Sequence, residues 1–466
     1  MGSKFETRLL GELCHEITVG FVGSMTNEYI ETGIPFLRSK NIDEYNVKWD
    51  DMKYVSSEFH KKLSKSALKP GDVAIVRTGK PGTTCVIPDS LHEANCSDIV
   101  IARVNNELLC PHYLSYFMNA MAHGQINAHV VGAVQQHFNV SSAKKIEIPL
   151  PSRFIQTEIV QVLKALDDKL RLNRQINQTL EQMAQALFKS WFVDFDPVVD
   201  NALDAGFFEQ NSDLPEELLS RAEQRKIVRE QPDFKPLPAE TCQLFPAEFE
   251  ECGEPSLGLS GWVPKGWKVG TLGDVLSLRN ERTKPSAETQ NIPYVPVECI
   301  STKEPFLSEF KSGDEAMSSL ILFKKGDVLF GAMRPYFHKV CIAPFDGVTR
   351  STVFTLTARD TESRYFSLFQ AYQESTIEYA TLHSEGSTIP YAKWRGSLER
   401  QPIILPTSQL QRLFHERIKL SIEWGDLNNK QSKTLSNLRD TLLPKLISGE
   451  LRLSDDGTLA SGNTDC

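Results

Sequence analysis

Two long stretches of the chain carry hydrophobic residues at the spacing of an amphipathic helix. In the first stretch, residues 155–192, one mostly apolar series repeats every seven residues from Ile159, and a second repeats from Leu163. This pattern is typical of the a and d positions of a coiled coil, and no glycine or proline interrupts it before Pro197. At about 1.5 Å per residue, the predicted helix is about 57 Å long.

The second stretch, residues 408–450, has a less regular pattern. Its hydrophobic frame shifts near residues 428–432, and Gly425 and Pro444 lie within it as weak points. We nevertheless predict a helix that pairs with the first one. The predicted core of the helix pair consists of Ile159, Leu163, Leu166, Leu170, Leu180, Leu187, Leu413, Leu420, Leu427, Leu435, Leu438 and Leu442.

The chain contains an internal repeat with a nearly constant offset of about 255 residues. Residues 69–73, KPGDV, return as KKGDV at 324–328, and 148–151, IPLP, return as IILP at 403–406. Asn173 and Asn428 stand at the same offset. A constant offset over this length predicts two copies of one unit, each a mixed domain followed by a long helix. The copies are residues 1–152 with the helical region 153–196, and residues 262–407 with the helical region 408–450.

Each mixed domain combines short strands with short helices. Apolar runs at 72–77 and 98–104, and their counterparts at 327–330 and 352–356, are bounded by glycine, proline and asparagine and therefore predict strands. Residues 111–120 and 365–372 have the pattern of short helices. The predicted fold class is α+β, with two tandem repeated domains separated by two long helices.

Two equivalent helices in a repeat are expected to pair with each other. If a pseudo-two-fold axis relates the copies, the paired helices run antiparallel as a coiled coil and the two domains lie at opposite ends. The alternative is that each helix is only a long core helix of its own domain. Asn173 and Asn177 either fix the register of the pair or face solvent.

The segment between the copies differs in composition. Residues 194–254 contain sixteen acids and five bases, so the rest of the chain has a net charge of +2 although the whole chain has −9. Basic faces are therefore possible outside this segment. Its prolines predict an irregular acidic linker over 197–261, interrupted by a short helix near 215–230, and residues 451–466 are expected to form a disordered tail.

Several function classes lack their motifs. The sequence has no phosphate-binding G-x-x-x-x-G-K-[ST], no H-E-x-x-H, and no amino-methyltransferase motif, because Asp196-Pro197-Val198 lacks the second proline and the aromatic residue. None of the nine cysteines forms a C-x-x-C pair, so we expect reduced thiols and no zinc site. No run reaches the length of a membrane span, and the N-terminus lacks an apolar signal core, so we expect a cytoplasmic protein without membrane contact. Catalysis is not expected.

The first helix carries a resemblance to a known family. Residues 166–198, LDDKLRLNRQINQTLEQMAQALFKSWFVDFDPV, resemble the central helix of specificity subunits of type I restriction-modification systems. LFPAEF at 244–249, VPKGW at 263–267 and LGD at 272–274 are similar to the approach to that family's second recognition domain, and LLPKLISGEL at 442–451 to its C-terminal end. The Pro-x-Gly-Trp lead-in is absent before Leu10-Gly11, which leaves the start of the first domain open.

The resemblance implies separate roles for this chain and for its partner subunits. Each mixed domain would be a target-recognition domain that reads one half of a bipartite double-stranded DNA target, and the helices would hold the two readers apart. Two methyltransferase subunits would dock on the helices and methylate adenine at N6, and motor-nuclease subunits would join for restriction. Ado-Met, ATP and Mg would bind these partners, and no cofactor would bind this chain. The length of the helices suits half-sites that lie about 34 Å apart per turn of DNA.

Side chains that reach base edges are expected in the loops of the two domains. Arginine and lysine favour guanine, whereas asparagine and glutamine favour adenine. For each residue, a solvated surface loop is the alternative, and Lys144, Lys145, Lys324 and Lys325 suit phosphate contacts better. The candidate DNA-contacting residues are Arg77, Thr78, Lys80, Thr83, Gln135, Gln136 and His137 in copy one, and Arg334, Tyr336, His338, Ser387, Thr388, Tyr391 and Lys393 in copy two.

Two other classes of function remain as alternatives to a DNA-specificity subunit. One is a self-contained methyltransferase or nuclease, which the absent motifs oppose. The other is a non-catalytic coiled-coil scaffold whose repeated domains bind protein. The modest basic character of the chain keeps this scaffold in consideration.

Overall fold

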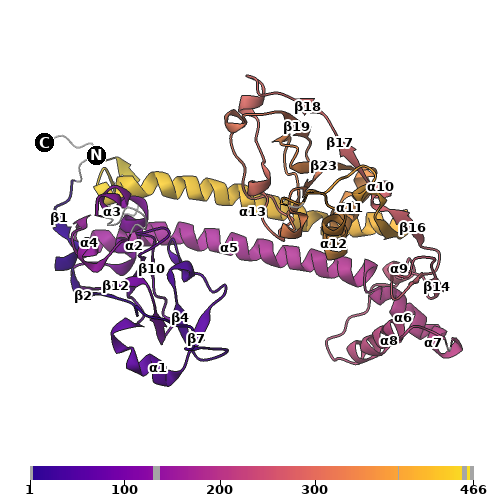
Figure 1. The fold of residues 1–466 in the computed structure, drawn as a ribbon, viewed down its shortest axis with the longest axis horizontal. Coiled ribbons are helices and arrows are strands. Elements are labelled where there is room, and N and C mark those ends of the chain that lie inside the picture. Colours follow the sequence, from indigo (N-terminus) through magenta and orange to yellow (C-terminus); the bar gives the residue numbers. More distant parts are fainter. Residues whose placement is uncertain (1–3, 130–136, 212, 387, 454–458, 462–466) are drawn as a thin grey trace. The chain divides into compact units, whose positions relative to one another are not determined.

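The chain divides into two compact units, each built around part of the helix pair. A computed structural model describes residues 4–129, 137–211, 213–386, 388–453 and 459–461. The first unit comprises Met1–Arg171 and Ser432–Cys466, and the second comprises Leu172–Gln431. The long helices α5 (Arg153–Phe192) and α13 (Ser408–Ser448) therefore contribute to both units. Figure 1 labels these elements along the chain.

The first unit contains a four-stranded antiparallel sheet. Its strand order is β10 (Thr84–Val86), β9 (Val73–Val76), β12 (Ile99–Val104) and β2 (Cys14–Val19). Every residue of β9 is buried, which explains its unbroken apolar run. Helix α2 (Pro111–Ala120) starts with proline in its first turn, where no backbone N–H is needed, and shares the hydrophobic core with this sheet.

The first unit contains further strands and three more short helices among its described residues. β1 (Thr7–Leu9) pairs with β13 (Glu147–Pro149), and a five-stranded sheet has the order β3-β7-β4-β11-β8. The remaining strands are β3 (Tyr29–Ile30), β4 (Ile34–Leu37), β5 (Ile42–Asp43), β6 (Asn46–Val47), β7 (Lys53–Val55), β8 (Ala67–Leu68) and β11 (Ala94–Cys96), and the short helices are α1 (Ser57–Lys62), α3 (His123–His129) and α4 (Val140–Lys144).

The second unit contains the same four-stranded arrangement. Its strand order is β21 (Val340–Ile342), β20 (Val328–Gly331), β23 (Val353–Ala358) and β17 (Leu276–Arg279), and α11 (Arg364–Tyr372) takes the place of α2. The two orders correspond strand by strand, so the predicted repeat and its α+β domains are confirmed. The remaining elements of this domain are β15 (Trp262–Pro264), β16 (Lys268–Thr271), α10 (Leu272–Val275), β18 (Arg282–Thr283), β19 (Leu320–Phe323), β22 (Gly347–Thr349), α12 (Glu374–Leu382) and β24 (Pro402–Leu405).

The two long helices contact each other in each unit, in antiparallel order. In the second unit, the ring of Phe188 lies 5.5 Å from that of Phe414, and Asn173 donates to the backbone carbonyl of Asn428 at 3.4 Å. In the first unit, Arg439 pairs with Asp167 at 2.8 Å. The contacts therefore follow rising numbers along α5 and falling numbers along α13, and the alternative of two unpaired core helices is wrong.

Two asparagines of α5 face α13. Asn177 donates to the side chain of Asn429 at 2.8 Å, and to the carbonyl oxygen of Gly425 at 3.3 Å. The side chain of Asn173 donates to Gln431 at 2.9 Å. Because buried amides need partners, these bonds favour one register of the helices, and the solvent-facing alternative is wrong. Gly425 lacks a side chain where a Cβ would lie 2.9 Å from the ring of Phe306, so α13 continues through this glycine.

The predicted core of the helix pair is partly wrong. Ile159, Leu163, Leu170 and Leu180 are buried as predicted, whereas Leu420 is 74%, Leu427 58% and Leu438 44% exposed. The seven-residue series of leucines predicts the wrong buried side of α13. This helix instead buries four residues, one turn apart, against the aromatic core of the second domain: Leu410, Phe414, Ile418 and Ile422. The other predicted core residues are half-buried: Leu166, Leu187, Leu413, Leu435 and Leu442.

The acidic segment is folded and helical, so the prediction of an irregular linker is wrong. It contains α6 (Asp196–Asp204), α7 (Phe207–Gln210), α8 (Glu216–Arg229) and α9 (Ala239–Cys242) and ends in β14 (Phe249–Glu251), which pairs with β15. Only α8 corresponds to the short helix that the sequence predicts. The prolines start helices here instead of breaking them, since Pro197 lies in the first turn of α6 and Pro215 caps α8.

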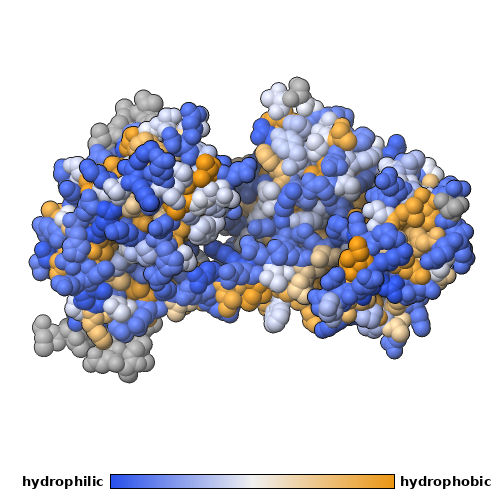
Figure 2. Space-filling model, turned by 90° about the horizontal axis from the view of Figure 1, so that it is seen from below, coloured by the Kyte–Doolittle hydropathy of each residue, from blue (hydrophilic) through white to orange (hydrophobic). Residues whose placement is uncertain are grey.

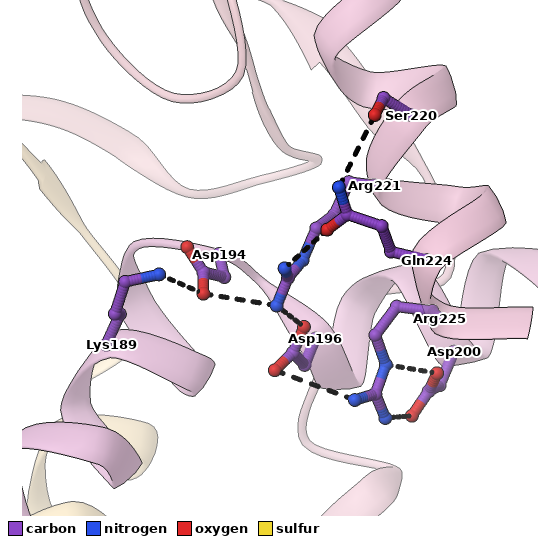
Figure 3. A network of polar contacts seen from close by, with 8 residues as sticks. All are labelled: Lys189, Asp194, Asp196, Asp200, Ser220, Arg221, Gln224 and Arg225. Atoms are coloured by element: carbon purple, nitrogen blue, oxygen red, sulfur yellow. Dashed lines mark hydrogen bonds and ion pairs between the residues drawn. The ribbon is translucent and has the colours of Figure 1, made fainter. Parts of the chain in front are cut away.

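A ladder of ion pairs joins α6 to α8 (Figure 3). Aspartates occur at every fourth position of α6 and arginines at every fourth position of α8, so that each set lies on one side of its helix. Arg221 also pairs with Asp194 at 3.1 Å, at the end of α5. The ladder therefore neutralises part of the acidic charge of this segment. Its pairs are Asp196–Arg221, Asp200–Arg225 at 2.5 Å and Asp204–Arg229 at 2.6 Å.

Replacing Arg225 with methionine is expected to loosen α6 and α8. The arginine side chain is only 13% exposed, so its loss leaves Asp200 largely buried without its partner. We expect the opening free energy of these helices to fall by about 1–3 kcal/mol, measured by hydrogen–deuterium exchange of their amides. The control is Lys226→Met, because Lys226 pairs with Glu223 in a solvent-exposed position. Equal effects of the two variants would contradict a role for the ladder.

Two further predictions concern the C-terminus and membranes. The residues described after Gly449 include β25 (Leu451–Leu453) and β26 (Leu459–Ser461), which pair antiparallel, so the prediction of a disordered tail is wrong for these six. Residues 454–458 and 462–466 of the predicted tail lie outside the described residues.

Within the described part of the chain, every helix is too short or too polar to span a membrane.

Candidate nucleic-acid interface

In the first unit, the candidate loop joins β9 to β10. Gly82 has φ +92°, a conformation that favours glycine, and a Cβ there would lie 2.3 Å from Cδ1 of Ile126. The backbone N–H of Gly82 donates to the carbonyl of Val76 at 2.9 Å. Glycine therefore allows the tight turn that holds the side chains of Arg77 to Thr83 between the two strands.

Arg77 and Thr78 share one carboxylate. Arg77 pairs with Asp98 at 3.1 Å, and the hydroxyl of Thr78 donates to the other oxygen of Asp98 at 2.6 Å. The carbonyl of Arg77 accepts from the backbone N–H of Phe138 at 3.0 Å, which places His137 close to the loop. The structure thus brings the two predicted segments of copy one together. Arg77 can contact a base or a phosphate only if its guanidinium group leaves the carboxylate of Asp98 or binds both groups at once.

The other candidates of copy one differ in exposure. Lys80 is exposed, and it forms no ion pair among the described residues, so its ammonium group is available to an anion. Thr83 and His137 are half-buried. Gln135 and Gln136 lie outside the described residues.

In the second unit, the corresponding loop joins β20 to β21. Arg334 has φ +52°, and its backbone N–H donates to the carbonyl of Pro390 at 2.8 Å. The next residues form a 3-10 turn, Pro335–Phe337, in which Tyr336 is 49% and Phe337 is 42% exposed. Two exposed aromatic side chains in contact are unusual on a free surface and favour a binding role.

The segment around Tyr391 lies against this loop. Tyr391 forms isolated backbone bridges with Met333 and Glu385, and its hydroxyl donates to the carbonyl of Ser351. Lys393 is paired with Glu385, so its charge is partly compensated. The structure thus brings together Arg334, Tyr336, Tyr391 and Lys393. Thr388, which is close to Tyr391 in the sequence, is exposed, and Ser387 lies outside the described residues.

His338 does not suit the predicted role of a base reader. Its side chain is buried, and Nε2 donates to the carbonyl of Tyr372 at 2.8 Å. Burial also lowers the pKa of His338 and so disfavours its charged form. An exposed loop histidine and one that turns into the core have the same sequence pattern, so the prediction of His338 as a DNA-contacting residue is wrong.

Sequence reasoning missed Asp98, Phe337 and Glu385. Both acids orient candidate cations, and neither has a distinctive sequence context. The signal for Phe337 is its position next to Tyr336 in a loop, where two adjacent aromatic residues are seldom needed for a core.

A second surface lies on α13. Leu420, Trp424 and Leu427 are 74%, 63% and 58% exposed, and their spacing of four and three residues places them on one side of the helix. We call this surface the α13 stripe. On the face of the molecule in Figure 2, hydrophobic residues occur as separate groups among larger hydrophilic areas. An exposed row of large apolar side chains on a helix is a candidate protein-binding surface.

The described residues contain no group of three histidine, cysteine or acidic side chains that could hold a metal ion. The eight described cysteines are free thiols, as predicted, and burial raises the pKa of Cys85 to about 12, which keeps it protonated.

Comparison with known proteins identifies the class. A family model described as the type I restriction modification DNA specificity domain matches the chain twice, at residues 2–182 and 264–436, once on each repeat. The chain therefore belongs to the family of type I restriction-modification specificity subunits, as the resemblance implied. These subunits are non-catalytic and supply DNA specificity.

Individual relatives agree with this assignment. The HindI specificity subunit of Haemophilus influenzae is 25% identical over 412 residues, which cover 83% of this chain and 88% of that protein. The MjaIX specificity subunit of Methanocaldococcus jannaschii is 26% identical over 330 residues, which cover 68% of this chain and 63% of that protein. A crystal structure of a type I S subunit from M. genitalium superposes with a TM-score of 0.53 at 13% identity, covering 95% of this chain and 96% of that one, and so shares the fold.

Proposed function

We propose that the chain reads a bipartite double-stranded DNA target and recruits two adenine-N6 methyltransferase subunits, with motor-nuclease subunits joining for restriction. The observation that carries this proposal is the repetition of one strand order, with β9–β10 and β20–β21 as corresponding loops. Two copies of one reader suit a target made of two half-sites. Ado-Met, ATP and Mg would then bind the partners, in the cytoplasm where the DNA lies.

The helix pair supports a pseudo-two-fold coiled-coil spacer. Asn173 and Asn428 occupy equivalent positions of the repeat, and they contact each other. Equivalent residues that contact each other are expected at a two-fold axis. In this proposal the helices set the unread gap between the half-sites, and the α13 stripe belongs to the surface on which a methyltransferase docks.

Replacing Arg77 with alanine tests the reading role. If Arg77 contacts a guanine, its loss should relax specificity at one position of one half-site by about 1–3 kcal/mol and leave the other half-site unchanged. Arg334→Ala should affect only the other half-site. The measurement is methylome sequencing of a host that expresses the chain with its cognate methyltransferase.

The control is Arg171→Ala, because Arg171 is an exposed residue of α5 that pairs with Asp168. Uniform weakening across all targets would indicate a phosphate contact for Arg77. The scaffold alternative is favoured by the carboxylates that compensate Arg77 and Lys393. The scaffold alternative predicts that substitutions in either loop leave the methylated DNA sequence unchanged.

A further inference from the structure

The second unit contains a cavity of about 770 Å³ against the second half of α5. Its walls come from α5, from the loop at 302–304, from the β20–β21 loop and from the junction of α11 with α12. We call it the α5 cavity. Its lining includes three acidic residues, a histidine and a tyrosine: Glu181, Glu304, Glu374, His338 and Tyr372.

Glu181 lies in the wall of the α5 cavity without a cationic partner. Its side chain accepts from Nε2 of Gln185 at 2.8 Å and from the hydroxyl of Tyr372 at 3.3 Å, and the residue is only 9% exposed. Burial, together with the nearby Glu304, raises the pKa of Glu181 to about 7. A carboxylate held in this way is stabilised in its charged form by an incoming cation.

His338 adds an acceptor that has no hydrogen-bond partner. A carbonyl oxygen can only accept, so the bond to Tyr372 places the proton of the neutral ring on Nε2 and leaves Nδ1 as an acceptor. Nδ1 is buried and has no hydrogen-bond partner, and it faces Oε2 of Glu374 at 3.3 Å. Oε2 of Glu374 also lies 3.5 Å from Nζ of Lys303, so Nδ1 of His338 is the acceptor that lacks a donor.

The cations that line the α5 cavity are already engaged. Lys189 pairs with Asp194, and Lys303 pairs with Glu374 at 3.5 Å in an exposed position. The described residues include no set of side chains that could hold a metal ion, so the excess of acceptors suits an organic cation. A guanidinium or ammonium group supplies several N–H donors on a long stem.

We propose that the α5 cavity receives an arginine or lysine side chain from the methyltransferase subunit that docks along the helix pair. This inference rests on the proposed function for the identity of the partner. The cavity exceeds the volume of one side chain, so a loop that carries the cation also fits. Its wall includes Gln178, Gln182 and Ala186 of α5, which pairs with α13, the helix that carries the proposed docking stripe.

Replacing Glu181 with glutamine tests the proposal. The amide keeps an acceptor for Gln185 and Tyr372 but removes the negative charge, so we expect a 10- to 100-fold loss of affinity for the purified cognate methyltransferase, measured by isothermal titration calorimetry. The methylated DNA sequence should not change. The control is Glu378→Gln, an exposed acid of α12 outside the cavity, which changes the net charge equally and should leave the affinity unchanged.

The pH dependence supplies an independent measurement. A bound cation requires ionised Glu181, whose pKa is about 7, so affinity should rise as the pH is raised from 6 to 8. Burial lowers the pKa of His338, so its neutral form is favoured over this range. The other charged groups that line the cavity, namely Glu304, Glu374, Lys189 and Lys303, are unchanged in Glu181→Gln. Glu181→Gln should therefore flatten the profile, and an unchanged profile would overturn the proposal.

The remaining outcomes separate the cavity from the function. If the wild-type chain binds methyltransferase and Glu181→Gln binds equally well, the cavity proposal is wrong and the function stands. If the wild-type chain binds no methyltransferase, the proposed function and the proposed partner are both overturned. L-arginine methyl ester then serves as the probe for the cavity: binding that Glu181→Gln abolishes supports a cation site, and equal or absent binding overturns it.

Discussion

Replacing Trp424 with aspartate is expected to prevent stable association with the methyltransferase. Trp424 is 63% exposed in the middle of the α13 stripe, between Leu420 and Leu427. Large aromatic residues at the centre of an interface contribute about 2–4 kcal/mol each, so affinity should fall roughly 30- to 1000-fold. Size-exclusion chromatography with light scattering, followed by calorimetry, measures this loss.

The fold of the variant should not change, because Trp424 contributes little to the core. Trp49→Asp is the matched control, since Trp49 is 52% exposed in the first domain, away from the helices in the sequence. It should leave the affinity for the methyltransferase unchanged. Full retention of affinity by Trp424→Asp would remove the α13 stripe from the docking surface.

Lengthening both helices by seven residues is expected to change the DNA target. One insertion follows Arg171 in α5 and the other follows Gln431 in α13, where the two compact units divide, so that contacts within each unit remain. Seven residues add about 10 Å and nearly two full turns, which preserves the paired face of each helix. The unread gap should grow by about three base pairs while both half-sites stay the same.

Methylome sequencing of a host that carries the lengthened chain measures the new gap. Sites with the original gap should lose methylation entirely, which makes this effect one of the largest expected. Insertion into α5 alone is the control, because it leaves seven residues without a partner helix and should abolish methylation at every spacing. An unchanged gap in the doubly lengthened chain would show that the helices do not set the spacing.

Local patterns were sufficient for the elements and for the repeat. The buried run of β9 and its counterpart β20 follow from residue type, because both faces of these central strands are covered. The 255-residue offset predicted that the same order of strands would recur, and it does. Helix bounds at Arg153–Phe192 and Ser408–Ser448 also agree with the pattern, because long amphipathic runs are the strongest local signal.

Local patterns failed where packing partners decided the outcome. Leu420 and Ile418 are both large and apolar, yet only Ile418 is buried, because the second domain covers one side of α13. The sequence predicts a linker for the acidic segment because its charges are visible, whereas the pairing of α6 with α8 is not. Likewise, Arg77 looks like a free cation until Asp98, a residue with no distinctive context, is found beside it.

The sequence by itself determined the repeat, the α+β class, the two long helices and, through family resemblance, the role in DNA specificity. These properties depend on residue type and spacing, which are local or periodic. Only the tertiary structure decided which side of α13 is buried, which loop residues are compensated by carboxylates, and that Glu181 and His338 line one cavity. The physical reason is that burial and pairing depend on residues far apart in the chain, whose proximity no local pattern specifies.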